Sequence, residues 1–394
     1  MLPVTYLDYA ATTPMDSRVR ETMTDAMATV YGNPSSLYAD GRAAKAAVEK
    51  ARRQVAALIG AKPEEIFFTS GGSESDNWAL KGMAFARRAA GQPCGIVTSA
   101  IEHPAVLRTC AWLEAQGIPV TKLPVDTEGL VSPATLASVL NDASDDGKST
   151  VGIVSVMMAN NEVGTIEPIA ELARVAHAHG AVFHTDAVQA AGHIPIDAQA
   201  LGIDALSLTA HKFCGPKGVG ALYLRRGVAI DPLILGGEQE RGLRAGTENV
   251  PGIVGLGCAA ELAAAELAAE AARLTELRQL LASRVQAISG CTLHQAEDDA
   301  QRLPGILNFG ITGVRHDALL IRLDRAGFAI SAGSACSAGS LEPSHVLAAM
   351  SVPEGRAQEA VRVSLGRFTT REDVLSFAAA LQREAASIRN LGTT

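Results

Sequence analysis

The stretch ALSLTAHKFCGPKGVGALYL, residues 205–224, decides the fold because it places two short apolar runs around a polar turn. The runs 205–209 and 221–224 are apolar on both faces, which is typical of strands buried in a parallel sheet. Lys212 follows the first run almost directly. The stretch therefore predicts an α/β core with a lysine at the end of a buried strand.

The same alternation of apolar runs and helical patterns extends outward from residue 224 back to about residue 51. Further strands are predicted at 66–69, 96–99, 151–156 and 182–185, and helices at 74–90, 104–116 and 168–179. Glycine follows the first and last of these helices, which is where a helix is expected to stop. We therefore predict one large α/β domain with a mostly parallel sheet.

Beyond residue 224 the pattern changes to a glycine-rich, charged segment, GGEQERGLRAGTEN (236–249), followed by an Ala- and Leu-rich stretch. Apolar residues at 274, 277, 281, 285 and 288 recur at spacings of three and four, which predicts a long helix that bridges two domains. The remainder has the pattern of a smaller α+β unit. We expect a large domain at 13–258 and a small one made of 1–12 and 259–394.

Composition narrows the possible partners and compartment. The chain of 394 residues has 34 Lys and Arg against 42 Asp and Glu, a net charge of −8, so nucleic acid and anionic membranes are not expected partners. With 47% hydrophobic and 19% charged residues, a wholly disordered chain is excluded. Six cysteines without a CxxC pair and an N-terminus without a signal-peptide pattern predict a cytoplasmic protein with no resident metal.

Lys212 and Asp186 are the first candidates for chemistry. A lysine at the end of a buried strand is partly desolvated, so its pKa falls and its amine can attack an aldehyde. Asp186 follows the run 182–185, with Gln189 three positions on. Pyridoxal phosphate needs a carboxylate beside its ring nitrogen. Taken singly, a surface lysine and a helix N-cap remain alternatives.

Two loops between a strand and a helix supply further candidates. FTSGGSES (68–75) offers Gly72 and Ser73 at a helix N-terminus, a setting that favours phosphate, although it matches neither common nucleotide motif and a plain loop is the alternative. His103 precedes Pro104 at the expected ligand-binding edge of the sheet. Its ring could stack on a flat cofactor and move protons near pH 7, or it could be an ordinary loop histidine.

Cys336 lies in SAGSACSAGSLEP (331–343), a run of small residues. A structural cysteine normally sits among apolar side chains, so this thiol is expected to be mobile and accessible to solvent. It could act as a nucleophile if its surroundings favour the thiolate, or be a plain exposed thiol.

The combination of these segments, in this order, resembles the pyridoxal-phosphate-dependent cysteine desulfurases of the nitrogen-fixation and iron–sulfur-cluster assembly type, within the class-V aminotransferase-like enzymes. The segments that carry the resemblance span almost the whole chain: YLDYAATTP (6–14), GNPSS (32–36), FTSGGSESDN (68–77), IEHPAVL (101–107), ANNEVG (159–164), HTDAVQ (184–189), HKFCGPKGVGALYLRRG (211–227), ERGLRAGTEN (240–249), SAGSACSAGSLEPSHV (331–346) and VRVSLGRFTT (361–370).

This resemblance implies the type I fold of pyridoxal 5'-phosphate enzymes, with a mostly parallel seven-stranded sheet in the large domain and a smaller α+β domain. It also implies roles at the cofactor ring. Lys212 would carry the cofactor covalently, Asp186 would pair with the ring nitrogen, and Gln189 with Asn161 would hold the phenolic oxygen. His103 would stack on the ring and assist proton transfer.

The remaining roles concern the phosphate, the substrate and the sulfur. Gly72, Ser73, Thr209 and His211 would bind the phosphate, and Thr247 would reach it from the neighbouring subunit of a homodimer. Arg362 would bind the substrate carboxylate through its planar fork.

The implied reaction converts L-cysteine to L-alanine and leaves the sulfur on Cys336 as a persulfide. A sulfur-acceptor or iron–sulfur scaffold protein would then receive it, with Cys336 as a transient cluster ligand. The alternatives are another type I enzyme of this cofactor, such as an aminotransferase or a selenocysteine or cysteine-sulfinate lyase, and a non-catalytic scaffold on the same fold.

Overall fold

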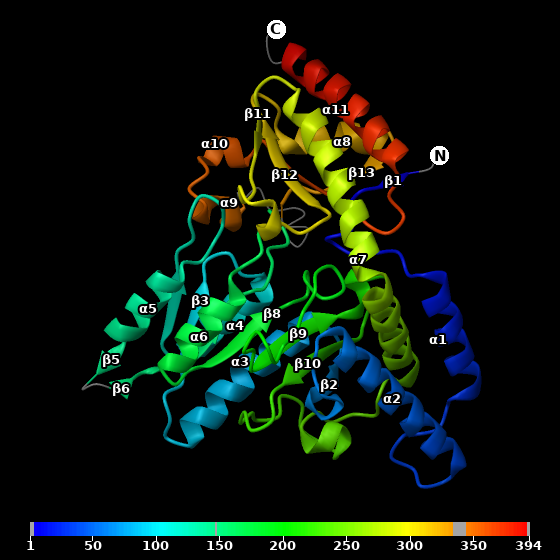
Figure 1. Cartoon of the computed structure of the whole chain (residues 1–394), viewed down its shortest axis with the longest axis vertical. Coiled ribbons are helices and arrows are strands. Elements are labelled where there is room, and N and C mark those ends of the chain that lie inside the picture. The colour runs from blue at the N-terminus through cyan, green and yellow to red at the C-terminus, as the bar shows by residue number, and fades with distance from the viewer. Residues whose placement is uncertain (1–3, 146–147, 334–343, 392–394) are drawn as a thin grey trace.

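The computed structural model describes residues 4–145, 148–333 and 344–391 (Figure 1). Its central element is a seven-stranded sheet in the order β2-β10-β9-β8-β7-β3-β4. β10 runs antiparallel to β2 and β9, whereas the other pairings in this sheet are parallel. The strands are β2 (Ile66–Thr69), β3 (Gly95–Ser99), β4 (Val120–Leu123), β7 (Val151–Ser155), β8 (Val182–Asp186), β9 (Ala205–Thr209) and β10 (Gly220–Leu224).

The predicted fold class is confirmed, and six of these strands coincide with predicted ones to within one residue. The alternation of apolar runs missed β4. This strand lies at the edge of the sheet, where Thr121 and Lys122 are exposed to solvent, so it lacks the continuous apolar composition of its neighbours.

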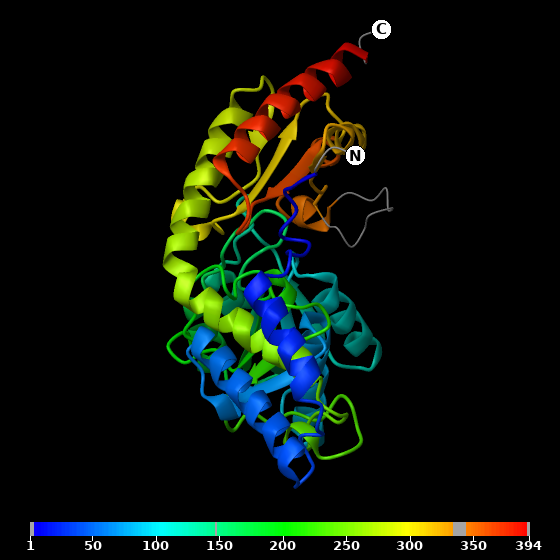
Figure 2. The same cartoon turned by 90° about the vertical axis from the view of Figure 1, so that its right-hand side faces the viewer.

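Helices cover both faces of the sheet (Figures 1 and 2). One face packs on α3 (Gly72–Ala89) and α4 (Pro104–Ala115), and the other on α2 (Ala39–Leu58), α5 (Pro133–Asp142) and α6 (Ile169–Ala178). Adjacent strand residues divide between the two layers, since Ile96 packs with Trp78 of α3 and Val97 belongs to the core on the opposite face.

The smaller unit is built on a three-stranded antiparallel sheet in the order β11-β12-β14. Near the N-terminus β1 (Thr5–Tyr6) pairs in parallel with β13 (Phe328–Ala329), so residues 5–7 lie in this unit, and Leu7 is part of its apolar core. Its other elements are β11 (Cys291–Leu293), β12 (Ile306–Ile311), β14 (Ala360–Ser364), α8 (His316–Arg325), α9 (His345–Ala349), α10 (Glu354–Ala357) and α11 (Arg371–Leu391).

Short elements complete the described chain. α1 (Ser17–Thr29) packs beside the long helix α7, and a small hairpin precedes β7. The hairpin strands are β5 (Ser144–Asp145) and β6 (Lys148–Ser149), and the 3-10 helices are η1 (Pro63–Glu65), η2 (Ala210–Lys212), η3 (Gln239–Gly242) and η4 (Asp299–Gln301).

Helix α7 (Val250–Gln286) contributes to both cores, as Figure 1 shows. Ile253 and Leu256 pack in the core of the seven-stranded sheet, whereas Leu274 and Leu281 pack in that of the small unit. The predicted boundary at residue 258 therefore falls inside this helix. By length and composition α7 could cross a membrane, but it packs against α1, α2 and α11, which makes it a core helix.

Candidate active site

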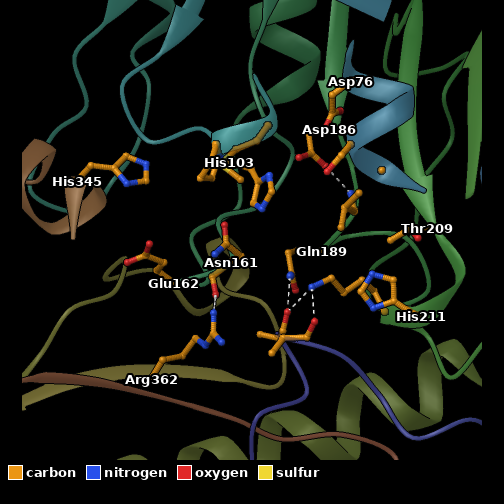
Figure 3. Close-up of a pocket in the computed structure, with 18 residues that line it drawn as sticks. Asp76, His103, Asn161, Glu162, Asp186, Gln189, Thr209, His211, His345 and Arg362 are labelled. Atoms are coloured by element: carbon orange, nitrogen blue, oxygen red, sulfur yellow. Dashed lines mark hydrogen bonds between the residues drawn. The ribbon is translucent and has the colours of Figure 1, made fainter. Parts of the chain in front are cut away.

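A cavity of about 250 Å³ lies at the carboxyl ends of β7, β8 and β9, between the two units (Figure 3). The carboxyl edge of a parallel sheet is where ligands of open α/β folds bind. Most of the predicted site residues line it, namely Gly72, Ser73, His103, Asn161, Asp186, Gln189, Thr209, His211, Lys212 and Arg362. The structure thus brings together residues that are spread over nearly 300 positions of the chain.

Lys212 ends η2, directly after strand β9. Its Nζ donates to the carbonyl oxygens of Ala10 at 2.5 Å and Ala11 at 2.9 Å. The carbonyl of Ala10 also accepts from Gln189 Nε2 at 2.9 Å. Residues 8–12, here called the N-terminal strip, therefore orient both the lysine amine and the glutamine amide at one side of the cavity.

Asp186 is the last residue of β8 and is 5% exposed. Its Oδ1 accepts from the Val188 amide at 2.8 Å, and burial raises its pKa, although the charges of His103 and Lys212 oppose that change. Asp76 of α3 lies next to it and is fully buried; burial and the charge of Asp186 raise the pKa of Asp76 well above its ordinary range. A cation that enters the cavity beside Asp186 would lower the pKa of Asp186 again, because the carboxylate and the cation stabilise each other.

The amino end of α3 also lines the cavity, about one helical turn before Asp76. The first amides of a helix have no intrahelical acceptor, so Gly72 and Ser73 present N–H groups to an anion. A Cβ at Gly72 would lie 2.5 Å from Val188 Cγ2, which explains the glycine. Thr209 Oγ1 donates to the Val219 carbonyl at 3.1 Å and keeps its lone pairs as acceptors, so this hydroxyl must rotate before it can donate to a phosphate.

His211 lines the same cavity from η2. Its Nδ1 lies 3.1 Å from Thr12 Oγ1, and burial lowers its pKa to about 4. A neutral ring whose Nδ1 accepts from the Thr12 hydroxyl carries its proton on Nε2. This tautomer can donate a hydrogen bond to an anion.

His103 is the N-cap of α4 and points into the cavity (Figure 3). Its Nδ1 accepts from the Ala105 amide at 3.1 Å, so in the neutral ring the proton is on Nε2. Burial is the main cause that lowers the pKa of His103. The side chain is therefore a neutral ring that can present an N–H to the cavity. Burial makes its protonated form unfavourable.

Arg362 of β14 forms the wall opposite the sheet and is 1% exposed. Its Nη1 donates to the Asn161 carbonyl at 2.8 Å, and its Nη2 donates to Asp8 Oδ1 at 2.7 Å. Each terminal nitrogen keeps a further N–H, so the guanidinium is held in place and can still bind a carboxylate through two parallel bonds.

This donor set fits pyridoxal phosphate. The cavity is lined by a buried carboxylate for the ring nitrogen, a helix N-terminus for the phosphate, a lysine amine and a histidine ring. Within residues 4–145, 148–333 and 344–391 no cluster of His, Cys, Asp or Glu side chains could hold a metal ion.

The two remaining predicted residues are Thr247 and Cys336. Thr247 is exposed and lines a different cavity of about 250 Å³ with Ser70 and Arg244, so its predicted reach into a neighbouring subunit stays a prediction. Cys336 belongs to the segment 334–343 and lies outside the described residues.

Several lining residues had no predicted role. The cavity is also lined by Glu162, His345, Asp76 and Ala10. Glu162 and Ala10 lie inside the quoted segments ANNEVG and YLDYAATTP. The family resemblance therefore covers these positions, although it implied no role for either residue. His345 likewise lies inside the quoted segment SAGSACSAGSLEPSHV (331–346), but no periodicity or charge pattern distinguishes it.

Comparisons with known proteins agree with this geometry. The aminotransferase class-V family model matches residues 5–377. A cysteine desulfurase IscS of Dictyoglomus turgidum is 49% identical, covering 98% of this chain and 95% of that protein. Another of the same name, from Methanosarcina thermophila, is 51% identical over 94% of this chain and 89% of its own.

A solved NifS-like protein superposes with a TM-score of 0.89 at 39% identity, covering 98% of this chain and all of that one. The family match covers nearly the whole chain, and the relatives share half of its residues over almost their full length. The chain therefore belongs to the aminotransferase class-V family of pyridoxal phosphate enzymes and, within it, to the cysteine desulfurases.

Proposed function

We propose that this protein converts L-cysteine to L-alanine and passes the sulfur to an acceptor protein. One observation carries the proposal: Lys212, the carboxylate of Asp186 and the guanidinium of Arg362 face one cavity that the amino terminus of α3 also lines. This set can hold pyridoxal phosphate and, opposite the sheet, the carboxylate of an amino acid.

Substrate binding depends on Arg362. Asp8 and the Asn161 carbonyl fix the guanidinium, so it presents a pre-oriented fork to the carboxylate of L-cysteine. Such a bidentate pair fixes the position of the substrate's α-carbon as well as contributing affinity.

When bound, pyridoxal phosphate supplies an electron sink for the bonds at the substrate's α-carbon. Asp186 keeps a proton on the pyridine nitrogen by pairing with it in a buried, low-dielectric setting. The amine of Lys212 accepts the α-proton, since it is the base at the sheet edge of the cavity. His103 presents Nε2–H and can deliver a proton to the carbon that loses sulfur.

The sulfur leaves as a persulfide. The Cys336 thiolate attacks the substrate sulfur and forms an S–S bond, while the substrate's Cβ–S bond breaks and its electron pair remains on carbon. Protonation of that carbon, followed by return of the proton that Lys212 removed from the α-carbon, completes alanine. A thiol of the acceptor then attacks the outer sulfur and regenerates the Cys336 thiolate.

We infer the partners from the same chemistry. The persulfide requires a protein acceptor or an iron–sulfur scaffold, on which Cys336 would be a transient cluster ligand. A homodimer would let Thr247 of one chain reach the phosphate bound by the other. Free thiols among the described cysteines suit a reducing cytoplasm.

The test replaces Cys336 by Ala and, as a control, the half-buried Cys258 by Ala. Cys336→Ala should abolish sulfide release from L-cysteine with a reductant while the visible absorbance of the bound cofactor is unchanged, and Cys258→Ala should keep full activity. Continued turnover by Cys336→Ala would favour another enzyme of this cofactor. Colourless protein that cannot be reconstituted would favour a non-catalytic scaffold.

A further inference from the structure

Glu162 is a buried carboxylate in the turn that follows β7, and the reaction described above gives it no role. It is 1% exposed. Its amide donates to Asn160 Oδ1 at 2.8 Å, and its carbonyl accepts from Asn308 Nδ2 at 3.2 Å. Both asparagines are fully buried, so the backbone that carries this carboxylate is fixed.

The carboxylate of Glu162 lies beside both residues that flank the segment containing Cys336. Ser344 Oγ donates to Glu162 Oε2 at 2.5 Å. A Cβ at Gly333 would lie only 2.7 Å from the same oxygen, so this position has no room for a side chain, and its φ of +44° also favours glycine. The carboxylate is thus hydrogen-bonded to the first residue described after the segment and allows only glycine at the last one before it.

Both flanks also contact the substrate-binding machinery. Ser331 exchanges two backbone hydrogen bonds with Arg362, of 2.7 and 3.2 Å. His345 Nε2 lies 2.9 Å from the carbonyl of Glu102, the residue before His103. Figure 3 shows Glu162 between His345 and Arg362 on the wall of the cavity. Where the segment is attached is therefore tied to where the substrate carboxylate binds.

We propose that Glu162 is a positioning residue for sulfur transfer: it holds Ser344 at the cavity wall, with Gly333 packed beside it, and so ties the chain on either side of the Cys336 segment to the substrate site. The inference rests on the proposed desulfurase function. Burial raises the pKa of Glu162, whereas the Ser344 hydrogen bond lowers it and so favours the charged form. A charge-assisted hydrogen bond of this kind is short and strong. A glutamine at position 162 could still accept the hydrogen bond from the Ser344 hydroxyl, whereas an alanine could not.

A purely structural role is the alternative, because Ser344 also caps α9 by accepting from the Leu347 amide at 3.2 Å. The matched control is Ser132, which caps α5 in the same way and does not line the cavity. Loss of a helix cap alone would affect Ser344→Ala and Ser132→Ala alike.

The experiment compares Glu162→Ala, Glu162→Gln, Ser344→Ala, the double alanine variant and Ser132→Ala, all loaded with cofactor. Mass spectrometry follows persulfide on Cys336 after one equivalent of L-cysteine. Nuclear magnetic resonance follows exchange of the α-proton of L-alanine with deuterated water, which needs the cofactor and Lys212 but not Cys336. Deuterium uptake at the Leu347 amide of cofactor-free protein reports on the flank independently of activity.

Glu162→Ala and Ser344→Ala should each slow persulfide formation about ten- to a hundredfold, the range expected when a hydrogen bond to a buried charge is lost. The double variant should be no slower than the slower single variant, because both remove one interaction. Glu162→Ala should speed deuterium uptake at Leu347. Glu162→Gln should restore both properties, and alanine exchange should be unchanged throughout. Ser132→Ala should match the wild type.

Unchanged persulfide formation in both single variants would overturn the inference, as would additive losses in the double variant. A parallel fall in alanine exchange would place Glu162 at the cofactor instead. If Glu162→Ala fails to fold, the Ser344→Ala variant still tests the proposal, because it removes a single oxygen atom. Wild-type protein that exchanges alanine protons but forms no persulfide would instead refute the proposed function.

Discussion

Arg362 Nη2 donates to Asp8 Oδ1 at 2.7 Å, although the two residues are 354 positions apart in the sequence. Arg362 is almost fully buried, and the N-terminal strip supplies its carboxylate partner. The chain therefore uses its first residues to orient the group that is proposed to bind the substrate near its end.

Replacing Asp8 by Asn should raise the KM for L-cysteine about tenfold with a smaller change in kcat, because the guanidinium loses its charged partner and its fixed orientation. Steady-state alanine formation measures both constants. Asp317→Asn is the control, since the Arg315–Asp317 pair is exposed and such pairs contribute little. A fall in kcat at constant KM would place Asp8 in the chemical steps.

Replacing Lys212 by Ala should lower the rate of alanine formation by about 10²- to 10⁴-fold, the usual range for loss of a catalytic base. The covalent link to the cofactor should also be lost. Borohydride reduction followed by mass spectrometry should add the cofactor mass to the wild type and to Lys217→Ala, whose side chain is exposed, but not to Lys212→Ala. A mass increase in Lys212→Ala would identify a different lysine.

Mixing two variants of low activity tests whether Thr247 serves a neighbouring chain. A dimer of one Lys212→Ala chain and one Thr247→Ala chain contains one site with both residues intact if Thr247 acts across the interface. Equal amounts, unfolded and refolded together, should recover about a quarter of wild-type activity. No recovery, despite weak activity of Thr247→Ala alone, would assign Thr247 to its own chain's site.

The buried Glu167 predicts a pH dependence of stability. Burial raises its pKa from 4.5 to about 8, so between these values the folded protein holds a proton that the unfolded chain has lost. The stability from this group is complete below pH 4.5 and is lost as the pH rises towards 8. The expected slope is about 1.4 kcal/mol per pH unit.

Glu167→Gln should therefore flatten the fall in unfolding free energy between acidic and alkaline pH, as measured by urea titration. The amide can still accept the hydrogen bond that the Val131 amide donates to Glu167 Oε2. Glu297→Gln, at an exposed position, should follow the wild-type curve. Parallel curves for Glu167→Gln and the wild type would show that Glu167 is ionised in the folded protein.

Residues at the ends of buried strands were predictable from the sequence. Lys212 and Asp186 closely follow apolar runs. Because the carboxyl ends of parallel strands lie at one edge of the sheet, the sequence alone predicts that these two residues lie near each other. Glu162 and His345 were not predictable in the same way. Their position depends on how the small unit packs over the sheet, which no local pattern encodes. The edge strand β4 was missed because its side chains face water.

The hydrogen bond from Thr209 Oγ1 to the Val219 carbonyl was not predictable from the sequence either. The hydroxyl already donates its proton to this carbonyl, whereas the predicted phosphate role requires it to donate to the phosphate. Sequence identifies the hydroxyl, whereas only the three-dimensional arrangement shows which acceptor it already has.

The continuity of α7 has a consequence for how such proteins can be recombined. Its 37 residues form one helix whose two halves belong to different cores, so no linker separates the units. A chimaera that joins this large unit to the small unit of a relative must be spliced within a helix. An insertion of a single residue at that splice would rotate one unit by about 100° against the other, since an α-helix has about 3.6 residues per turn. Helical register therefore helps to keep Arg362 and Lys212 at one cavity.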